Sequence, residues 1–258
     1  MRFLDAKAVK IILYISLPLV LIAVWVIVSA FELVNPFLIP PPEKVWETAL
    51  ELFASGVIWN HIAISLARVW GGFILSVLFA LPLALLFHEV PFLRRAFHGL
   101  FEMLHSVPPL ALIPLLILWF GIGEGSKIAV IILASFFPAF LNAESAFASM
   151  DTRLLELSRS LDLSYSRHLF SVLIPASLPQ IITGLRLGFG YAWRALLGAE
   201  LIASASGLGY FISNSQAMAR TDRVFAGIII IGLLGTFFDA VLRRAARTLA
   251  GYDIPGTA

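Results

Sequence analysis

The sequence predicts an all-α polytopic membrane protein with six transmembrane helices, and three observations lead to this fold class. Of the 258 residues, 60% are hydrophobic and 13% are charged, about half the charged fraction of an average soluble domain. Several uncharged stretches approach the roughly 20 apolar residues that a helix needs to cross a hydrocarbon core. No hydrophilic stretch is long enough for a separate soluble domain, so residues 1–258 are expected to form a single transmembrane domain.

The first predicted span covers about residues 11–31 and follows a short basic segment, so a signal peptide is the alternative interpretation. Its uncharged core is longer than the roughly 7 to 15 residues of a signal sequence, and more spans follow. We therefore expect this segment to be retained as the first helix.

Five further apolar runs predict the remaining spans, at about 62–87, 100–120, 128–147, 181–202 and 224–242. Three prolines, Pro108, Pro109 and Pro114, lie within the third span of the chain and should break or kink it. Lipid tolerates such a break only where protein or a water-filled cavity satisfies the freed carbonyl groups. The bend could be purely structural or could line a transport pathway.

Basic residues are distributed unevenly between the two sets of loops that six spans create. One set carries Arg2, Lys7, Lys10, Arg94, Arg95, Arg153, Arg159, Arg167, Arg243, Arg244 and Arg247. The opposite set carries only Lys44, Lys127, Arg220 and Arg223. Because cytoplasmic loops hold the excess of lysine and arginine, both termini are predicted to be cytoplasmic.

The longest cytoplasmic connection on this topology covers about residues 149–180, too long for a simple turn. Asp151 is the expected N-cap of a short helix in this loop. One face of that helix consists of Leu154, Leu157, Ser158 and Leu161. A second short helix should begin after Ser164 and run toward Pro175, so that the two helices form a docking surface at the cytoplasmic mouth.

Within this loop, LELSRSLDLSYSRHLFSVLIP resembles the EAA signature of binding-protein-dependent ABC importer permeases. That pattern has a Glu and two small residues, a Gly after three more positions, and an Ile-x-Leu-Pro ending. Glu156, Ser158 and Pro175 match it. Leu157 departs from the usual Ala, and Asp162 stands in place of Gly. Asp is among the few other residues that tolerate positive φ, at a cost of about 1 kcal/mol.

The resemblance extends from about Asn35 to the end of the last span. The segments similar to the branch that imports nitrate, taurine, alkanesulfonates, bicarbonate or thiamine-precursor pyrimidines are NPFLIPPPEKVWETA, HSVPPLALIPLLILWFGIGEGSKI, LPQIITGLRLGFGYAWRALLGAELIA, SGLGYFI and TDRVFAGIIIIGLLG. The resemblance implies a type I ABC importer permease of a bacterial inner membrane. The implied solute is small and anionic, with a thiamine-precursor pyrimidine as the alternative.

The same resemblance implies the partners of the chain. They are a second permease subunit, expected to be an identical copy, two cytoplasmic ATPases and an extracytoplasmic solute-binding protein. The Glu156 loop would be the coupling helix that contacts the ATPase. The residues expected to hold the ATPase are Glu156, Leu154, Leu157, Ser158, Leu161, Asp162 and Pro175.

Ionisable residues within the spans are candidates for lining the pathway, because a charge that faces lipid costs several kcal/mol. Arg68 and Arg186 lie near span ends, so they are expected to reach the headgroups, with lining of the pathway as the alternative. Arg194 lies deeper and could line the pathway or join helices. Glu200 lies about 240° from Arg194 around the helix, so it should cap a neighbouring helix end or meet Arg194 of a second copy. Asp239 is expected to pair with Arg243 at i, i+4.

Other function classes find little support in the sequence. The chain lacks a phosphate-binding G-x-x-x-x-G-K-[ST] loop, so a partner must supply ATP hydrolysis. No catalytic, cofactor or metal site is expected, since the chain has no cysteine and His88-Glu89 lacks the second histidine of H-E-x-x-H. A net charge of +2 does not indicate nucleic-acid binding. A self-sufficient secondary transporter or channel, and a scaffold without a transport role, remain the alternatives to the importer.

Overall fold

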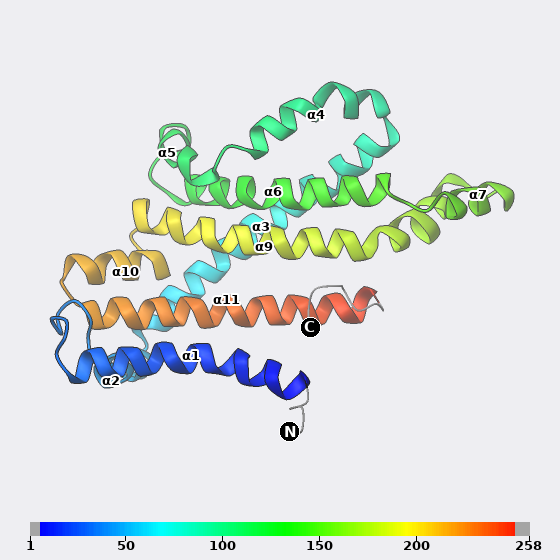
Figure 1. Cartoon of the computed structure of the whole chain (residues 1–258). Helices are drawn as coiled ribbons and strands as arrows, with labels where there is room; N and C mark the ends of the chain where they lie inside the picture. The colour runs from blue at the N-terminus through cyan, green and yellow to red at the C-terminus, as the bar shows by residue number, and fades with distance from the viewer. Residues whose placement is uncertain (1–5, 251–258) are drawn as a thin grey trace. The chain divides into compact units, whose positions relative to one another are not determined.

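The computed structural model describes residues 6–250, and all regular structure in that range is helical (Figure 1). The α-helices are α1 (Ala6–Ala30), α2 (Pro42–Ala54), α3 (Val57–Glu89), α4 (Pro91–His105), α5 (Ile113–Phe120), α6 (Glu124–Ala148), α7 (Thr152–Ser160), α8 (Tyr165–His168), α9 (Ile174–Ala203), α10 (Leu208–Ala217) and α11 (Thr221–Ala250). A 3₁₀ turn, Pro109–Leu112, precedes α5, and a π-helical turn, Leu169–Leu173, joins α8 to α9. The predicted all-α class is confirmed.

Within residues 6–250, four helical segments are long and apolar enough to cross a membrane. They are Val57–Glu89, Glu124–Ala148, Tyr165–Ala203 and Thr221–Thr248, and they correspond to four of the predicted spans. The predicted first span corresponds to α1, of which Ser16–Ala30 is a shorter apolar helix. The total of six spans stays a prediction.

The predicted third span, at about 100–120, is not one continuous helix. It is divided between α4 and the segment Pro109–Phe120, which holds a 3₁₀ turn and α5, and the two parts differ in direction by 83° across a break of at most 4 residues. Pro108 has an extended ψ of 123°, and Pro109 begins the 3₁₀ turn. A proline in a helix interior removes one backbone hydrogen bond and clashes with the preceding turn. The predicted break at these prolines is confirmed.

The described chain separates into two compact units. The first contains the chain up to Trp59 together with Phe211–Ile230, and the second contains Asn60–Tyr210 and the chain from Ile231 onward. In the first unit, the Trp25 indole N–H donates to the carbonyl of Pro40 at 3.1 Å. The Thr48 hydroxyl of α2 donates to the Asp222 carboxylate at the start of α11, at 2.8 Å.

The second unit is built around α6 and α9, which run side by side in opposite directions (Figure 1). Small residues allow their close approach: a Cβ atom at Gly184 would lie 2.4 Å from Cβ of Asn142. Helices in membranes associate through such close van der Waals contacts, because the hydrophobic effect does not drive them together in lipid. An aromatic cluster on α6 adds to the core, with the Phe140 ring 5.2 Å from Phe87 and 4.8 Å from Phe101.

The antiparallel pair has two distinct ends. The start of α6 and the end of α9 lie at the end near α5, whereas α7 projects beyond the opposite end (Figure 1). The 25 residues of α6 separate these ends by about 37 Å, at 1.5 Å per residue. Each end carries residues that the sequence marks as functional.

Candidate functional site

The α7 loop begins with the predicted cap. The Asp151 carboxylate accepts the backbone N–H of Arg153 at 2.9 Å, and the Asp151 carbonyl accepts the N–H of Leu154 at 3.0 Å. This is the arrangement of an N-cap residue, which satisfies an orphan donor in the first helical turn. Helix α7 therefore starts where the sequence predicts.

Helix α7 ends at Ser160, and Asp162, in the turn that follows, stands in place of the family glycine. Asp162 has a φ of +47°, in the left-handed region that Gly enters freely and Asp tolerates. The chain then turns back at Ser164, and α8 begins at Tyr165. The predicted start of the second short helix is confirmed. That helix does not stop near Pro175, however, because the π-helical turn carries it directly into α9.

The turn between α7 and α9 encloses a surface recess of about 320 Å³, named here the α7 recess. It is lined by Leu154, Ser158, Leu161, Leu163, Ser171, Val172, Pro175 and Ala176. Ser158 is buried, and its hydroxyl lies 3.1 Å from Nδ1 of His168. Leu161, directly after α7, is 62% exposed, and Glu156 is exposed on α7. The Leu157 side chain lies outside the described part of the structure.

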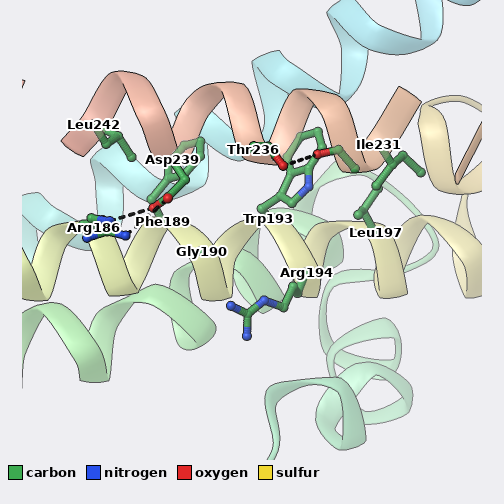
Figure 2. Close-up of a pocket in the computed structure, with 12 residues that line it drawn as sticks. Arg186, Phe189, Gly190, Trp193, Arg194, Leu197, Ile231, Thr236, Asp239 and Leu242 are labelled. Carbon is green, nitrogen blue, oxygen red and sulfur yellow. Dashed lines mark hydrogen bonds and ion pairs between the residues drawn. The ribbon is translucent and has the colours of Figure 1, made fainter. Parts of the chain in front are cut away.

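A second recess, of about 430 Å³, lies between α9 and α11 (Figure 2). Its lining is mostly apolar and includes Phe189, Trp193, Leu197 and Ile231. At one end, Nε of Arg186 donates to Asp239 at 2.6 Å. Asp239 also accepts from Arg243, which confirms the predicted i, i+4 pair. Arg186 thus joins α9 to α11, and its expected place at the headgroups stays a prediction.

Arg194 also lines this recess, and its side chain points away from α11 (Figure 2). The residue is exposed, and its guanidinium lies 5.2 Å from the centroid of the Tyr191 ring. Among the side chains that the structure describes, no carboxylate forms an ion pair with Arg194. Arg194 is therefore a cation on an exposed face of a membrane-spanning helix.

Arg68 and Glu200 meet in the second unit, at the end opposite α7. Nη1 of Arg68 lies 2.7 Å from Oε1 of Glu200, and both side chains are buried, at 6% and 0% exposure. Glu124 and Lys127, from the start of α6, complete a cluster that we name the charge network. The expectation that Arg68 reaches the headgroups is wrong, because Arg68 faces these carboxylates inside the unit.

Glu200 caps a neighbouring helix, which was one of the two predicted roles. Its carboxylate accepts the backbone N–H of Gly209, in the first turn of α10, at 2.9 Å, and the hydroxyl of Ser65 at 2.8 Å. Gly207 approaches so closely that a Cβ atom there would lie 2.2 Å from Oε1 of Glu200. This contact and its φ of +105° explain why Gly207, the first glycine of the SGLG segment, is a glycine.

Glu124 and Lys127 were missed as site residues by the sequence analysis. Lys127 was counted only among the basic residues of one set of loops, and Glu124 was not named. A signal did exist, because a charge within a span requires an internal partner. Spacing along the chain cannot identify that partner, since 56 residues separate Arg68 from Glu124.

Comparison with known proteins assigns this fold to a class of protein: the permease subunit of an ABC transporter, with a type I importer fold. Residues 72–251 match the family described as the binding-protein-dependent transport system inner membrane component, and the chain belongs to that family. It is thus a multi-pass inner-membrane protein.

Curated relatives cover most of the chain. The taurine transport system permease protein TauC of Escherichia coli is 37% identical over 89% of this chain and 86% of its own length. The putative aliphatic sulfonates transport permease protein SsuC of Bacillus subtilis is 37% identical over 90% and 84%. The nitrate import permease protein NrtB of Synechocystis is 30% identical over 85% and 82%.

Solved structures share the fold at low sequence identity. An inward-facing MetNI methionine ABC transporter structure matches with a TM-score of 0.66 and 16% identity, over 75% of this chain and 98% of that one. A second crystal form of the same transporter matches with a TM-score of 0.63 and 17% identity, over 74% and 94%.

Proposed function

We propose that this chain forms the membrane pathway of an importer that is driven by two separate ATPases and supplied by an extracytoplasmic binding protein. The observation that carries the proposal is the α7 recess. It exposes Leu161 and places Glu156 on a capped helix that projects beyond α6 and α9. An exposed apolar hollow rimmed by polar groups suits a partner surface. The absence of a phosphate-binding loop in the sequence assigns ATP hydrolysis to that partner.

The proposed solute is a small anion of the sulfonate or nitrate type. The named solutes of three relatives are taurine, aliphatic sulfonates and nitrate. Arg194 supports this class from the structure, because it lies nine residues before the end of α9, or about 14 Å. Side chains on a helix lean toward its N-terminus, so Arg194 leans away from the nearer end. We assign it to the pathway, where it would attract an anion.

The pathway is proposed to lie between two copies of this chain. The exposed face of α9 carries Leu187, Tyr191, Arg194 and Leu201 at helical spacing. A charged residue on a face covered by lipid would cost several kcal/mol, so a second copy and a water-filled conduit are the proposed neighbours. The excess of lysine and arginine in one set of loops supports cytoplasmic termini and a cytoplasmic α7.

Mass spectrometry of proteins that co-purify with the chain, after gentle extraction from its native membrane, tests the assembly. We expect an ATPase with a phosphate-binding loop and a solute-binding protein. Recovery of the chain by itself would favour the self-sufficient transporter or channel.

Glu156→Lys tests the docking surface separately. Because Glu156 is exposed, the variant should fold normally and lose solute uptake while ATP hydrolysis becomes uncoupled or the ATPase dissociates. Glu156→Gln is the matched control and should retain more activity. Normal uptake by Glu156→Lys would contradict the proposal.

A further inference from the structure

Arg68 is held by two carboxylates that differ sharply in exposure. The Glu200 side chain is fully buried, whereas the Glu124 side chain is 57% exposed. Both belong to the charge network, at the end of the second unit opposite α7. Glu200 is therefore a structural counter-ion of Arg68, whereas Glu124 is a counter-ion that water can reach.

Glu200 cannot leave without disrupting its surroundings. It also accepts hydrogen bonds from Ser65 and from the backbone of Gly209, both at 2.9 Å or less. Removing one partner of a buried ion pair leaves the other charge uncompensated, which is strongly destabilising. Glu200 is therefore the permanent partner of Arg68.

Glu124 binds the opposite side of the guanidinium in a bidentate arrangement. Its Oε2 lies 2.6 Å from Nε of Arg68, and its Oε1 lies 2.6 Å from Nη2. The same Oε1 accepts from the ammonium of Lys127 at 3.1 Å, and Lys127 is itself only 5% exposed. Two buried cations thus share one accessible carboxylate. The Ser206 hydroxyl lies in the same region, where it accepts from Nη2 of Arg68 at 2.9 Å.

The charge balance allows another anion to replace Glu124. Arg68 and Lys127 carry two positive charges, while Glu200 and Glu124 carry two negative ones. If Glu124 rotates into water, a monovalent anion restores neutrality. An anion with two or more oxygen atoms matches the fork of Nε and Nη2, because a guanidinium binds planar or multi-oxygen groups in bidentate geometry.

We propose that Arg68 and Lys127 form an oxyanion-binding site in which the Glu124 carboxylate is a built-in, displaceable occupant. The ligand class is a monovalent oxyanion such as a sulfonate. The inference rests on the proposed importer function, since Lys127 belongs to the loops predicted to be extracytoplasmic and the site would receive the solute at entry. Glu124 would then keep the two cations neutralised whenever solute is absent.

Binding of methanesulfonate to the purified complex tests the site, with sodium chloride at equal ionic strength as the reference. Thermal unfolding at increasing anion concentration gives the apparent affinity. A tethered carboxylate competes at an effective concentration in the millimolar range. We therefore expect Glu124→Ala to bind methanesulfonate at least about tenfold more tightly than the wild type. The double variant Glu124→Ala with Lys127→Met should lose this gain.

Glu102→Ala is the matched control, because Glu102 is also an exposed carboxylate, at 66%, and pairs with His98 instead. It should bind as the wild type does. If Glu124→Ala does not fold, Glu124→Gln keeps the side-chain shape and should shift the affinity in the same direction.

Two results would overturn the site: no gain of affinity over the wild type in either Glu124 variant, or an equal effect of chloride. The binding assay needs no ATP. A negative binding result together with intact ATP-driven uptake would therefore refute the oxyanion site and leave the importer function standing. Absence of a co-purifying ATPase would refute the importer function, and the binding result would still test the oxyanion site.

Discussion

The two ends of the α6–α9 pair differ in what they bury: one end buries charged side chains, and the other leaves an apolar side chain exposed. At one end, the charge network buries Arg68, Lys127 and Glu200 and satisfies them within the unit. Arg68 pairs with Glu200, Lys127 pairs with Glu124, and Glu200 accepts from the backbone of Gly209. At the other end, the α7 recess leaves Leu161 exposed. The first end is complete within one chain, and the second has a surface that another protein would cover.

Buried charge and exposed apolar surface therefore affect different properties of this protein. A change in the charge network should act on the stability of the permease itself. A change in the α7 recess should act on assembly and transport and leave the stability unchanged. The following predictions test this contrast, from the largest expected effect to the smallest.

Glu200→Ala should have the largest effect on stability. It leaves Arg68 buried beside an exposed Glu124 and removes the cap of α10, which should lower the free energy of unfolding by about 3 to 5 kcal/mol. Unfolding in mixed detergent micelles measures this change. Glu102→Ala, which removes an exposed carboxylate on α4, should stay within about 0.5 kcal/mol of the wild type. Equal stability of the two variants would show that the charge network is not structural.

Gly184→Val should weaken the helix pair that joins the two ends. The new Cβ atom would lie 2.4 Å from Asn142, so α6 and α9 must separate, at a cost of about 1 to 3 kcal/mol. Gly71→Val on α3 is the matched control, since a Cβ atom at Gly71 would point into open space, with no neighbouring element within 4 Å. The same unfolding assay compares them, and a stable Gly184→Val would refute the tight α6–α9 contact.

Leu161→Asp should leave the permease stable and reduce its assembly. Leu161 is 62% exposed, so the free energy of unfolding should change by less than about 0.5 kcal/mol. The amount of co-purifying ATPase should fall about tenfold or more, as expected for loss of an interface anchor. Ser160→Asp places the same charge on α7 outside the recess lining and should retain the ATPase. If both variants retain it, the recess is not the docking surface.

Asp162→Gly should have the smallest effect. Glycine relieves the cost of positive φ but increases the entropy of the unfolded chain, so the two contributions nearly cancel, to within about 0.5 kcal/mol. Asp162→Val should instead raise hydrogen exchange in the α7 loop, because a β-branched residue strongly disfavours a φ of +47°. Equal exchange rates in both variants would contradict a left-handed turn at this position.

Local patterns predicted the α7 end well. The cap at Asp151, the left-handed turn at Asp162 and the helix start after Ser164 all depend on residues within a few positions of one another. Steric limits and short-range hydrogen bonds act over that distance, so the sequence contains the information. The π-helical turn into α9 was missed, because nothing in the local pattern distinguishes it from the end of a short helix.

The sequence by itself determined the all-α membrane class, the break at Pro108 and Pro109 and the family resemblance, because apolar length, proline geometry and motif spacing are properties of the chain. Only the tertiary structure decided the partners of the charged residues. Arg68 was expected at the headgroups, but it pairs inside the unit with a carboxylate 56 positions away. Arg186 pairs with a carboxylate 53 positions away, which its position in the chain did not predict. Ion pairing depends on distances of a few ångströms between atoms, and packing of the helices sets those distances.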